Sequence, residues 1–321
     1  MTLSIVIVSY KTCALLQRCL QSIYDASLPF PFETIVVDNN SSDGSPEMVR
    51  KNFPQVNLID NKQNLGYSVA NNQGIAESTG ELILLLNPDT EVNRDAIEGM
   101  TVFLQKHTQA AVAGCQLVFS DGTPQTSWFH FPMPLSRSIE HRRWYPRLAH
   151  FLLGISHKNP EIKGENAQCV DIIKGACMMI RRGALNDVGL FDENAFLYAD
   201  DNDWCLRARR RGWDAYFLPS LTILHHGWAS TDQEPFLTIV NSRRSALYFH
   251  RKHYNWFLVL IWTFLIYLEI LYKFLLNALR YRLRRNDEKI RERYRAYAFL
   301  AREIFKLSPS GQKKINHEGH E

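Results

Sequence analysis

The stretch GELILLLNPDT at residues 80–90 decides the fold of this chain. Its aliphatic run at 82–86 is typical of a strand that is buried on both faces, as in a parallel sheet. Pro88 has no amide hydrogen and a fixed φ, so the strand ends at this turn. Asp89 is therefore expected to project from the carboxyl end of the strand. Taken alone, an Asn-Pro-Asp tripeptide is more often a plain turn.

Similar short apolar runs alternate with helical patterns on both sides of this strand. Toward the N-terminus the strand-like runs are 5–8, 34–38 and 56–59, and the helical patterns include 46–52 and 66–78. Toward the C-terminus the strand-like runs are 170–180, 215–218 and 220–224, with a helical segment at 203–211. This alternation predicts βαβ units, and hence an α/β fold with a mainly parallel sheet flanked by helices.

Polar residues follow three of the predicted strands. The clusters are Ser9-Tyr10-Lys11, Asp38-Asn39-Asn40 and Asn87-Pro88-Asp89. Ligands of open α/β sheets bind beyond the carboxyl ends of the strands, so these clusters are candidates for one site. Any one of them could be only a turn, because Asn, Asp, Pro and Ser are turn-forming residues. The three together favour a ligand-binding site.

The composition is that of an ordinary globular protein, with 321 residues of which 45% are hydrophobic and 22% charged. This length suits one large α/β domain or two modest ones. The formal net charge of +4 is mild, and no nucleic-acid partner is expected. The chain starts directly with a strand-like run and lacks the basic start and longer apolar core of a signal peptide. We therefore expect this part of the chain in the cytoplasm.

Two further clusters carry groups suited to acid–base or metal chemistry. The segment YADDNDWCLR at 198–207 contains Asp200 and Asp201, and repulsion between adjacent carboxylates raises at least one pKa, as a general base requires. The same carboxylates would also cap a helix. His225 follows a strand-like run and is either a metal or phosphate ligand or a structural histidine. Asp89 offers the carboxylate oxygen that Mg²⁺ and Mn²⁺ prefer.

Taken in order, these segments resemble the inverting family 2 glycosyltransferases of the GT-A fold, in particular their bacterial rhamnosyltransferase-like branch. The matching stretches are SIVIVSYK (4–11), VVDNNSSDGS (36–45), NLGYSVANNQG (64–74), GELILLLNPDT (80–90), IKGACMMIRRGALNDVGLFDENAFLYADDNDWCLRARRRGW (173–213) and LHHGWAS (224–230). They lie within residues 3–250, and their order and spacing make the combination specific. The resemblance implies a Rossmann-like GT-A sheet.

The resemblance also implies a nucleotide-sugar site. Its members would be Ser9, Tyr10, Asp38, Asn64, Gly66, Asn72, Asp89, Lys174 and Gly175. The first two would line the nucleotide pocket, and Asp38 would bind the base or the ribose. The residues at 64–72 would shape the pocket beside the diphosphate. Lys174 and Gly175 would face the sugar and the acceptor.

For the metal and the catalytic base, the resemblance points to two places. Asp89 matches the last carboxylate of the metal-binding DxD motif, and Asn87 replaces the first. With one protein carboxylate left, His225 becomes a credible second ligand of Mg²⁺ or Mn²⁺. Asp200 and Asp201 stand where the family has Glu-Asp. We expect Asp201 to be the base, although Asp200 stays open.

The implied reaction is a single in-line displacement with inversion. Asp201 takes the proton of an acceptor hydroxyl, the oxygen attacks the anomeric carbon, and the nucleoside diphosphate leaves. The expected donor is a dTDP- or UDP-linked sugar, with rhamnose suggested by the branch, and the acceptor is a lipid-linked or cell-surface glycan. Two alternatives are an inactive membrane-bound scaffold that binds nucleotide sugars, and a sugar nucleotidyltransferase. The second lacks the basic Gly-rich loop expected after the first strand.

The C-terminal third predicts contact with a membrane. Residues 256–268 are uncharged and apolar, and as a helix they rise only about 20 Å, less than the ~30 Å hydrocarbon core. Beyond them Glu269, Lys273, Asn277 and Arg280 recur on one helix face, and Glu269 could pair with Lys273. Basic residues flank the run on both sides, which favours a helix or hairpin lying in the interface. A membrane span, a buried core helix and a dimer interface are the alternatives.

These patterns divide the chain into three parts. We expect a glycosyltransferase domain at 1–250, with a nucleotide-sugar-binding half at about 1–115 and an acceptor-binding half at about 116–250. A helical membrane-association region follows at 251–306, and a disordered tail at 307–321. The expected location is the cytoplasmic face of the bacterial inner membrane, with peripheral or monotopic attachment. A homo-oligomer is left open.

Overall fold

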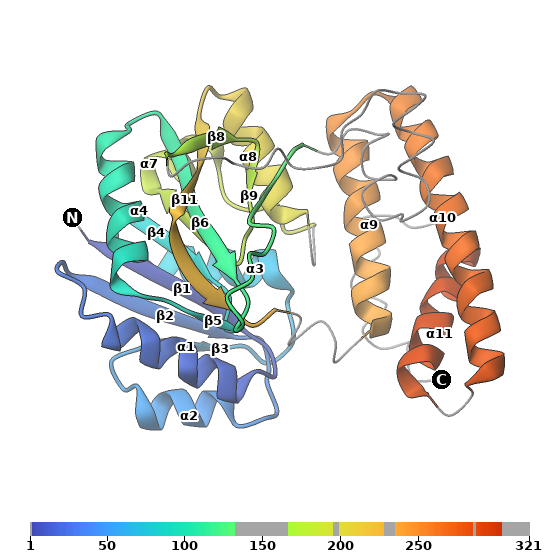
Figure 1. Ribbon diagram of the computed structural model, residues 1–321, viewed down its shortest axis with the longest axis horizontal. Coiled ribbons are helices and arrows are strands. Elements are labelled where there is room, and N and C mark those ends of the chain that lie inside the picture. The colour runs from blue at the N-terminus through green and yellow to red at the C-terminus, as the bar shows by residue number, and fades with distance from the viewer. Residues whose placement is uncertain (1, 132–165, 195–198, 228–234, 285–286, 304–321) are drawn as a thin grey trace. The chain divides into compact units, whose positions relative to one another are not determined.

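The computed structural model describes residues 2–131, 166–194, 199–227, 235–284 and 287–303 (Figure 1). The chain forms two compact units. The first comprises Met1–Phe131, Ile162–Glu193 and Asp200–Ser230, and the second comprises Pro132–Glu161, Asn194–Ala199 and Thr231–Glu321. The second unit begins before the boundary that we expect at residue 250, and the three-part division stays a prediction. The tail at 307–321 lies outside the described residues.

Nine of the described strands form one sheet in the first unit. They are β1 (Leu3–Ser9), β2 (Phe32–Asp38), β3 (Asn57–Asp60), β4 (Leu82–Leu86), β5 (Thr90–Glu91), β6 (Ala110–Val118), β8 (Gln168–Val170), β10 (Cys177–Arg181) and β11 (Asp214–His225). The order is β3-β2-β1-β4-β10-β6-β11-β5, and β8 pairs with β11. Strands β1 to β4 are parallel, β10 is antiparallel to both its neighbours, and β6 is parallel to β11. A two-stranded sheet pairs β7 (Trp128–Phe129) with β9 (Ile172–Ile173).

Helices cover both faces of the large sheet. They are α1 (Cys13–Asp25), α2 (Ser45–Asn52), α3 (Tyr67–Glu77), α4 (Arg94–Lys106), α7 (Arg182–Val188) and α8 (Asp200–Arg210). Successive side chains of a strand point to opposite faces, so Ile5 and Ile7 pack into the core under α1, α2 and α4. Val6 and Val8 pack into the second core, under α3, α7 and α8. The predicted α/β sheet flanked by helices is confirmed (Figure 1).

The strands after residue 165 differ in detail from the predicted ones. The run at 170–180 is divided among β8, β9 and β10. The two runs at 215–218 and 220–224 form the single strand β11, with a shift of register between Leu218 and Thr222. Pro219 lies inside this shift, and because proline cannot donate a ladder hydrogen bond, an irregularity there is the expected way to accommodate it.

The described part of the second unit contains three helices that enclose their own core. These are α9 (Pro235–His253), α10 (Trp256–Leu283) and α11 (Glu288–Glu303), coloured orange to red in Figure 1. Their core includes Val240, Trp262, Ile266 and Leu300. Glu269 of the predicted polar face of α10 points inward: one of its carboxylate oxygens lies 2.7 Å from a guanidinium nitrogen of Arg243 on α9 and 2.8 Å from Nζ of Lys273, whereas Arg280 is exposed. The pairing of Glu269 with Lys273 is confirmed.

The opposite face of α10 is an apolar surface that we call the apolar stripe. Its members are Trp256, Phe257, Leu260, Phe264, Leu268, Tyr272, Leu275, Leu279 and Leu283, all exposed. After the first residue they recur every three or four positions, and so they follow one side of the helix along its whole length. Within the described residues α10 is the single helix that is long and apolar enough to cross a membrane.

Candidate active site

The predicted site residues gather at the edge of the sheet where the parallel strands end. Ser9 closes β1 and lies in register with Asp38 at the end of β2. The end of β4 lies opposite the start of β10, so the segment just before β10 reaches the same edge. His225 closes β11 and is paired with Thr90, one residue after Asp89. Topology alone therefore brings these distant segments together.

Asp89 and His225 face each other at this edge. Oδ1 of Asp89 lies 3.4 Å from Nε2 of His225, and both side chains are buried. The main chain fixes the pair, because the amide of His226 donates to the carbonyl oxygen of Asp89 at 2.8 Å.

The Asp89–His225 pair fits a divalent cation. Mg²⁺ and Mn²⁺ accept carboxylate oxygen and imidazole nitrogen, and they take phosphate oxygens and water as further ligands. Neighbouring ligands of an octahedral ion with bonds of about 2.1 Å lie about 3 Å apart, close to the 3.4 Å observed here. No group of three or more His, Cys, Asp or Glu suited to a metal occurs among the described residues. The protein would thus supply two ligands.

Asp200 and Asp201 begin helix α8 and have different surroundings. Asp201 is partly exposed, and its Oδ2 accepts a hydrogen bond from the amide of Gly175 at 3.3 Å. Asp200 is buried, and burial together with the charge of Asp201 raises its pKa to about 8. These surroundings favour the protonated form of Asp200, and the partly exposed Asp201 is the more accessible carboxylate of the pair.

Lys174 and Tyr67 connect the two groups of carboxylates. Burial lowers the pKa of Lys174, whereas the negative charges of Asp89 and Asp201 act to raise it. Burial raises the pKa of Tyr67, and the charges of Asp200, Asp201 and Asp89 raise it further. The carboxylate that faces His225 and the pair at the start of α8 are thus within electrostatic range of the same two side chains. They form one site.

Tyr67 is a site residue that the sequence pattern does not predict. Its hydroxyl lies 3.3 Å from Oδ1 of Asn87 and 3.0 Å from the carbonyl oxygen of Gly175, so it donates to either acceptor. It therefore ties the turn that carries Asp89 to the loop that contacts Asp201. In the sequence Tyr67 is an ordinary aromatic at the start of a helix, and nothing local indicates its partners.

Asp38 presents a buried carboxylate oxygen that lacks a hydrogen-bond partner. Oδ2 accepts from the amide of Ser41 at 2.7 Å, whereas Oδ1 is buried and without a partner among the described residues. Burial raises the pKa of Asp38, although the hydrogen bonds of Ser41 act in the opposite direction. A buried acceptor of this kind is costly unless a ligand satisfies it. The N–H of a nucleobase or a ribose hydroxyl is a suitable donor.

The neighbouring predicted residues of β1 line the same edge. Oγ of Ser9 lies 3.1 Å from Oγ1 of Thr12, so its hydroxyl is engaged within the loop. Tyr10 is half-buried, and Nζ of Lys11 lies 4.8 Å from the centre of its ring. Tyr10 follows Ser9, which is in register with Asp38, and a partly exposed aromatic ring can stack on a planar base.

Three predicted residues belong to α3 and the segment before it. Oδ1 of Asn64 accepts from the amide of Gly66 at 3.0 Å, and Gly66 precedes the helix with a φ of 85°, which favours glycine. Asn72 is turned elsewhere: its side-chain amide exchanges hydrogen bonds of 2.9 and 3.0 Å with the main chain of Phe191, after α7. These contacts show Asn72 holding that segment, and its predicted place beside the diphosphate stays a prediction.

Solved structures share this architecture. One is the mannosyltransferase PcManGT of Pyrobaculum calidifontis, in complex with GDP-Man and Mn²⁺, with a TM-score of 0.51, 16% identity and coverage of 95% of this chain and 86% of that one. Another is GalNAc-T7 with UDP, GalNAc and Mn²⁺, with a TM-score of 0.52, 16% identity and coverage of 77% of this chain and 47% of that one. The fold is that of the GT-A glycosyltransferases.

Residues 4–189 match the family described as glycosyl transferase family 2, and the chain belongs to this family. A similar relative is the N-acetylglucosaminyl-diphospho-decaprenol L-rhamnosyltransferase of Mycobacterium tuberculosis, 27% identical over 275 residues that cover 81% of this chain and 88% of the relative. The hexosyltransferase Agl10 of Haloferax volcanii, named for low-salt glycan biosynthesis, is 31% identical over 65% of this chain and 62% of the relative. The predicted membership and enzyme class are confirmed.

Proposed function

We propose that this family 2 glycosyltransferase moves a sugar, with inversion and with the help of a divalent cation, from a nucleoside diphosphate to a hydroxyl of a lipid-linked or cell-surface glycan. The observation that carries the proposal is the assembly of two acidic groups at one sheet edge. Asp89 faces His225 at 3.4 Å, and Asp201 faces the Gly175 loop. Both acidic groups act on Lys174 and Tyr67.

Each residue has a distinct task in this proposal. Asp38 accepts a hydrogen bond from the nucleobase or ribose with its orphan oxygen. Asp89 and His225 would hold Mg²⁺ or Mn²⁺, and the cation would supply charge neutralisation for the leaving diphosphate. Asp201 takes the acceptor proton while the acceptor oxygen bonds to the anomeric carbon and the bond to the diphosphate oxygen breaks. Asp200, kept protonated by burial and by its neighbour, leaves the negative charge on Asp201.

The chemistry of the donor and acceptor is inferred from the relatives. The mycobacterial relative is named as a rhamnosyltransferase acting on a lipid diphosphate that carries N-acetylglucosamine. A dTDP-rhamnosyl transferase, RfbF of Shigella flexneri, is 22% identical over 60% of this chain and 58% of the relative. These names favour dTDP-rhamnose over UDP-linked sugars as donor, and a polyprenyl diphosphate glycan as acceptor.

A panel of nucleotide sugars tests the proposal. The purified protein is incubated with dTDP-, UDP- and GDP-sugars, with Mg²⁺ or Mn²⁺ or with a chelator, and the released nucleoside diphosphate is measured. We expect release from dTDP-rhamnose that depends on added cation and increases when a lipid-linked acceptor is supplied. Equal release with the chelator would exclude the metal. Binding of the donor without release in any mixture would instead support the non-catalytic scaffold.

We also propose that α10 attaches the second unit to the cytoplasmic surface of a bacterial inner membrane, as a peripheral or monotopic element. A contiguous apolar surface of this length is costly in water. The inward face of α10 carries the ion pairs of Glu269 and packs against α9 and α11, so among the described residues of this helix the side left open to lipid is the apolar stripe. Such a helix lies in the interface plane rather than across the bilayer.

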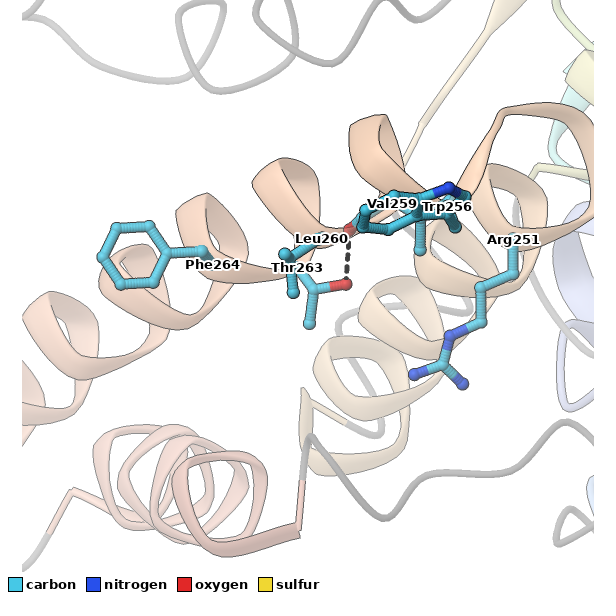
Figure 2. Close-up of a pocket in the computed structure, with 6 residues that line it drawn as sticks. All are labelled: Arg251, Trp256, Val259, Leu260, Thr263 and Phe264. Carbon is cyan, nitrogen blue, oxygen red and sulfur yellow. Dashed lines mark hydrogen bonds between the residues drawn. The ribbon is translucent and has the colours of Figure 1, made fainter.

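Basic residues flank the apolar stripe at both ends. Figure 2 shows a pocket of about 370 Å³ that is lined by Arg251 near the end of α9 and by Trp256, Val259, Leu260, Thr263 and Phe264 in the first turns of α10. The hydroxyl of Thr263 donates to the carbonyl oxygen of Val259 at 2.8 Å, so the lining presents mainly carbon. Arg280 and Arg282 occupy the last turn. Anionic lipid headgroups are attracted to such cations.

A further inference from the structure

The side-chain amide of Gln125 contacts His225 at two points. Its contact with the backbone carbonyl of His225 determines which amide atom faces the imidazole ring. The amide nitrogen of Gln125 donates to the backbone carbonyl oxygen of His225. The amide oxygen of Gln125 lies 2.7 Å from Nδ1 of the His225 ring. A backbone carbonyl can only accept, so the nitrogen of the amide must face it. The orientation of the amide is thereby fixed, and its oxygen must face the ring.

This orientation determines which ring nitrogen of His225 carries the proton. An amide oxygen only accepts hydrogen bonds, so Nδ1 must be the N–H donor. A neutral imidazole has a single N–H, so Nε2 keeps its lone pair. That lone pair belongs to the nitrogen 3.4 Å from Oδ1 of Asp89. A cation binds imidazole through such a lone pair, and a second hydrogen bond to the other nitrogen commonly sets the tautomer.

Gln125 is itself held in place by the strand before it. After β6 the chain folds back, so that the amide of Gln125 donates to the carbonyl oxygen of Leu117 at 2.8 Å. The side-chain amide of Gln116 donates to the carbonyl oxygen of Gln125 at 2.7 Å. Because β6 is paired with β11, with Val118 opposite Leu224, this fold-back places Gln125 beside the end of β11. The main chain around Gln125 therefore has few ways to relax.

We propose that Gln125 is a positioning residue that fixes His225 in the Nδ1–H tautomer and aims the Nε2 lone pair at the cation site shared with Asp89. The proposal rests on the proposed metal function of Asp89 and His225. A purely structural Gln125 would only join the end of β6 to β11 through the carbonyl of His225. The two roles use different atoms of the same amide, so they can be separated by substitution.

Two variants separate the roles. Gln125→Leu removes both the donor and the acceptor with little change of volume. Gln125→Glu keeps an oxygen for Nδ1–H but loses the amide hydrogen that reaches the carbonyl of His225. Gln21→Leu serves as a matched control, because Gln21 is exposed on α1, far in the chain from Gln125, and its side-chain amide donates to Asp25 at 2.8 Å. Thermal unfolding of all four proteins checks that each one is folded.

The first readout is the tautomer of His225 in the metal-free protein. Nitrogen NMR of ¹⁵N-histidine-labelled protein at about pH 8, above the ordinary histidine range, distinguishes Nδ1–H from Nε2–H. We expect Nδ1–H in the wild type, in Gln125→Glu and in the control, and a shift toward Nε2–H in Gln125→Leu. An unchanged tautomer in Gln125→Leu would overturn the proposal. This readout needs no metal, so it stands even if the metal role fails.

The second readout is Mn²⁺ affinity, measured by titration of the Mn²⁺ electron paramagnetic resonance signal. We expect Gln125→Leu to weaken binding by about 10- to 100-fold, as removal of a residue that orients a metal ligand commonly does, and Gln125→Glu to stay close to wild type. Equal weakening in both variants would assign Gln125 a structural role only. Absence of Mn²⁺ binding in the wild type would instead overturn the proposed metal site, and with it this part of the proposal.

Discussion

Asp201 and Asp200 are adjacent in the chain, but changing each to asparagine should have a different effect. Asp201→Asn should lower the rate of transfer, whereas Asp200→Asn should raise stability relative to wild type as pH rises. Asp201→Asn removes the proposed proton acceptor, and general-base catalysis contributes about 10²- to 10⁴-fold in rate. We expect transfer to fall by that factor while the donor still binds, as measured by steady-state transfer and by calorimetric titration with the nucleotide sugar. Near-normal turnover of Asp201→Asn would move the base to another residue.

The raised pKa of Asp200 predicts how stability depends on pH. The pKa of Asp200 is about 8 in the folded protein and about 3.9 in the unfolded one. Between these two pH values Asp200 carries a proton when the protein is folded and loses it when the protein is unfolded. Unfolding then releases a proton, so this group lowers the free energy of unfolding as pH rises from about 4 to about 8. Asp200→Asn does not titrate. The unfolding temperature of Asp200→Asn should therefore rise relative to that of wild type as pH increases from 5 to 8.

The measurement is a set of thermal unfolding curves for wild type and Asp200→Asn at several pH values in that range. The difference between the two proteins should grow with pH in favour of the variant. A difference that is constant across the range would show that Asp200 is already ionised in the folded protein. The affinity for nucleotide sugar provides a check that the asparagine has not disturbed the site.

At the level of residues, the sequence predicts groups whose chemistry is visible without a partner. Asp89 and His225 lie at the ends of predicted strands, and Asp201 lies at the start of a predicted helix, so the sequence pattern indicates all three. Gln125 and Tyr67 could not be predicted, because their importance lies in contacts made 100 and 108 residues away in the chain. A glutamine in a turn and an aromatic in a helix carry no local signal of such contacts.

Among the elements, helix α3 lies so close to β1 that Gly74 has no room for a side chain. A β-carbon there would lie 2.3 Å from Cγ1 of Val6. We expect Gly74→Ala to lower the free energy of unfolding by about 1–3 kcal/mol, the usual cost of overpacking, as measured by urea denaturation. Gly183, in α7, is the control: its nearest neighbour would be 3.9 Å away, so alanine should be neutral or stabilising by up to ~1 kcal/mol.

Among the strands, the sequence predicts those whose pattern depends only on burial, and it does not predict the direction in which a strand runs. Strands β1, β2 and β4 are continuous apolar runs between turn residues, and this pattern depends only on burial of both faces. The direction of β10 could not be predicted, because an apolar run such as that at 177–181 is the same in either orientation. Its antiparallel pairing with β4 is decided by contacts between the two strands, in particular Cys177 opposite Leu86.

For the whole molecule, the apolar stripe predicts binding to anionic membranes. Leu260→Glu combined with Phe264→Glu places two negative charges on its exposed side, and we expect loss of co-sedimentation with vesicles of mixed neutral and anionic lipid. The control is Val102→Glu, an exposed apolar residue of α4 outside the stripe, which should bind as wild type does. Vesicle binding by the double variant at the wild-type level would exclude the stripe as the attachment surface.

Extraction of native membranes distinguishes a helix in the interface from one that crosses the bilayer. An interfacial α10 should be released by alkaline carbonate, and high salt should weaken its attachment because the flanking cations are screened. A crossing helix would resist both treatments. Sequence alone leaves these possibilities open, because the ion pairs that turn Glu269 inward involve Arg243, which lies on another helix.

The late position of β11 in the chain has a consequence for biosynthesis. The strand β5, directly after Asp89, is paired with β11, and β11 also contributes His225. A ribosome completes β1, β2 and β4 long before it reaches β11, so the strands that carry the proposed nucleotide site precede the proposed cation pair in time. A nascent or prematurely terminated chain that ends before residue 214 would lack half of this pair. If this pair holds the cation as proposed, such fragments should be unable to consume the activated sugar, and the enzyme would become competent only when β11 is in place.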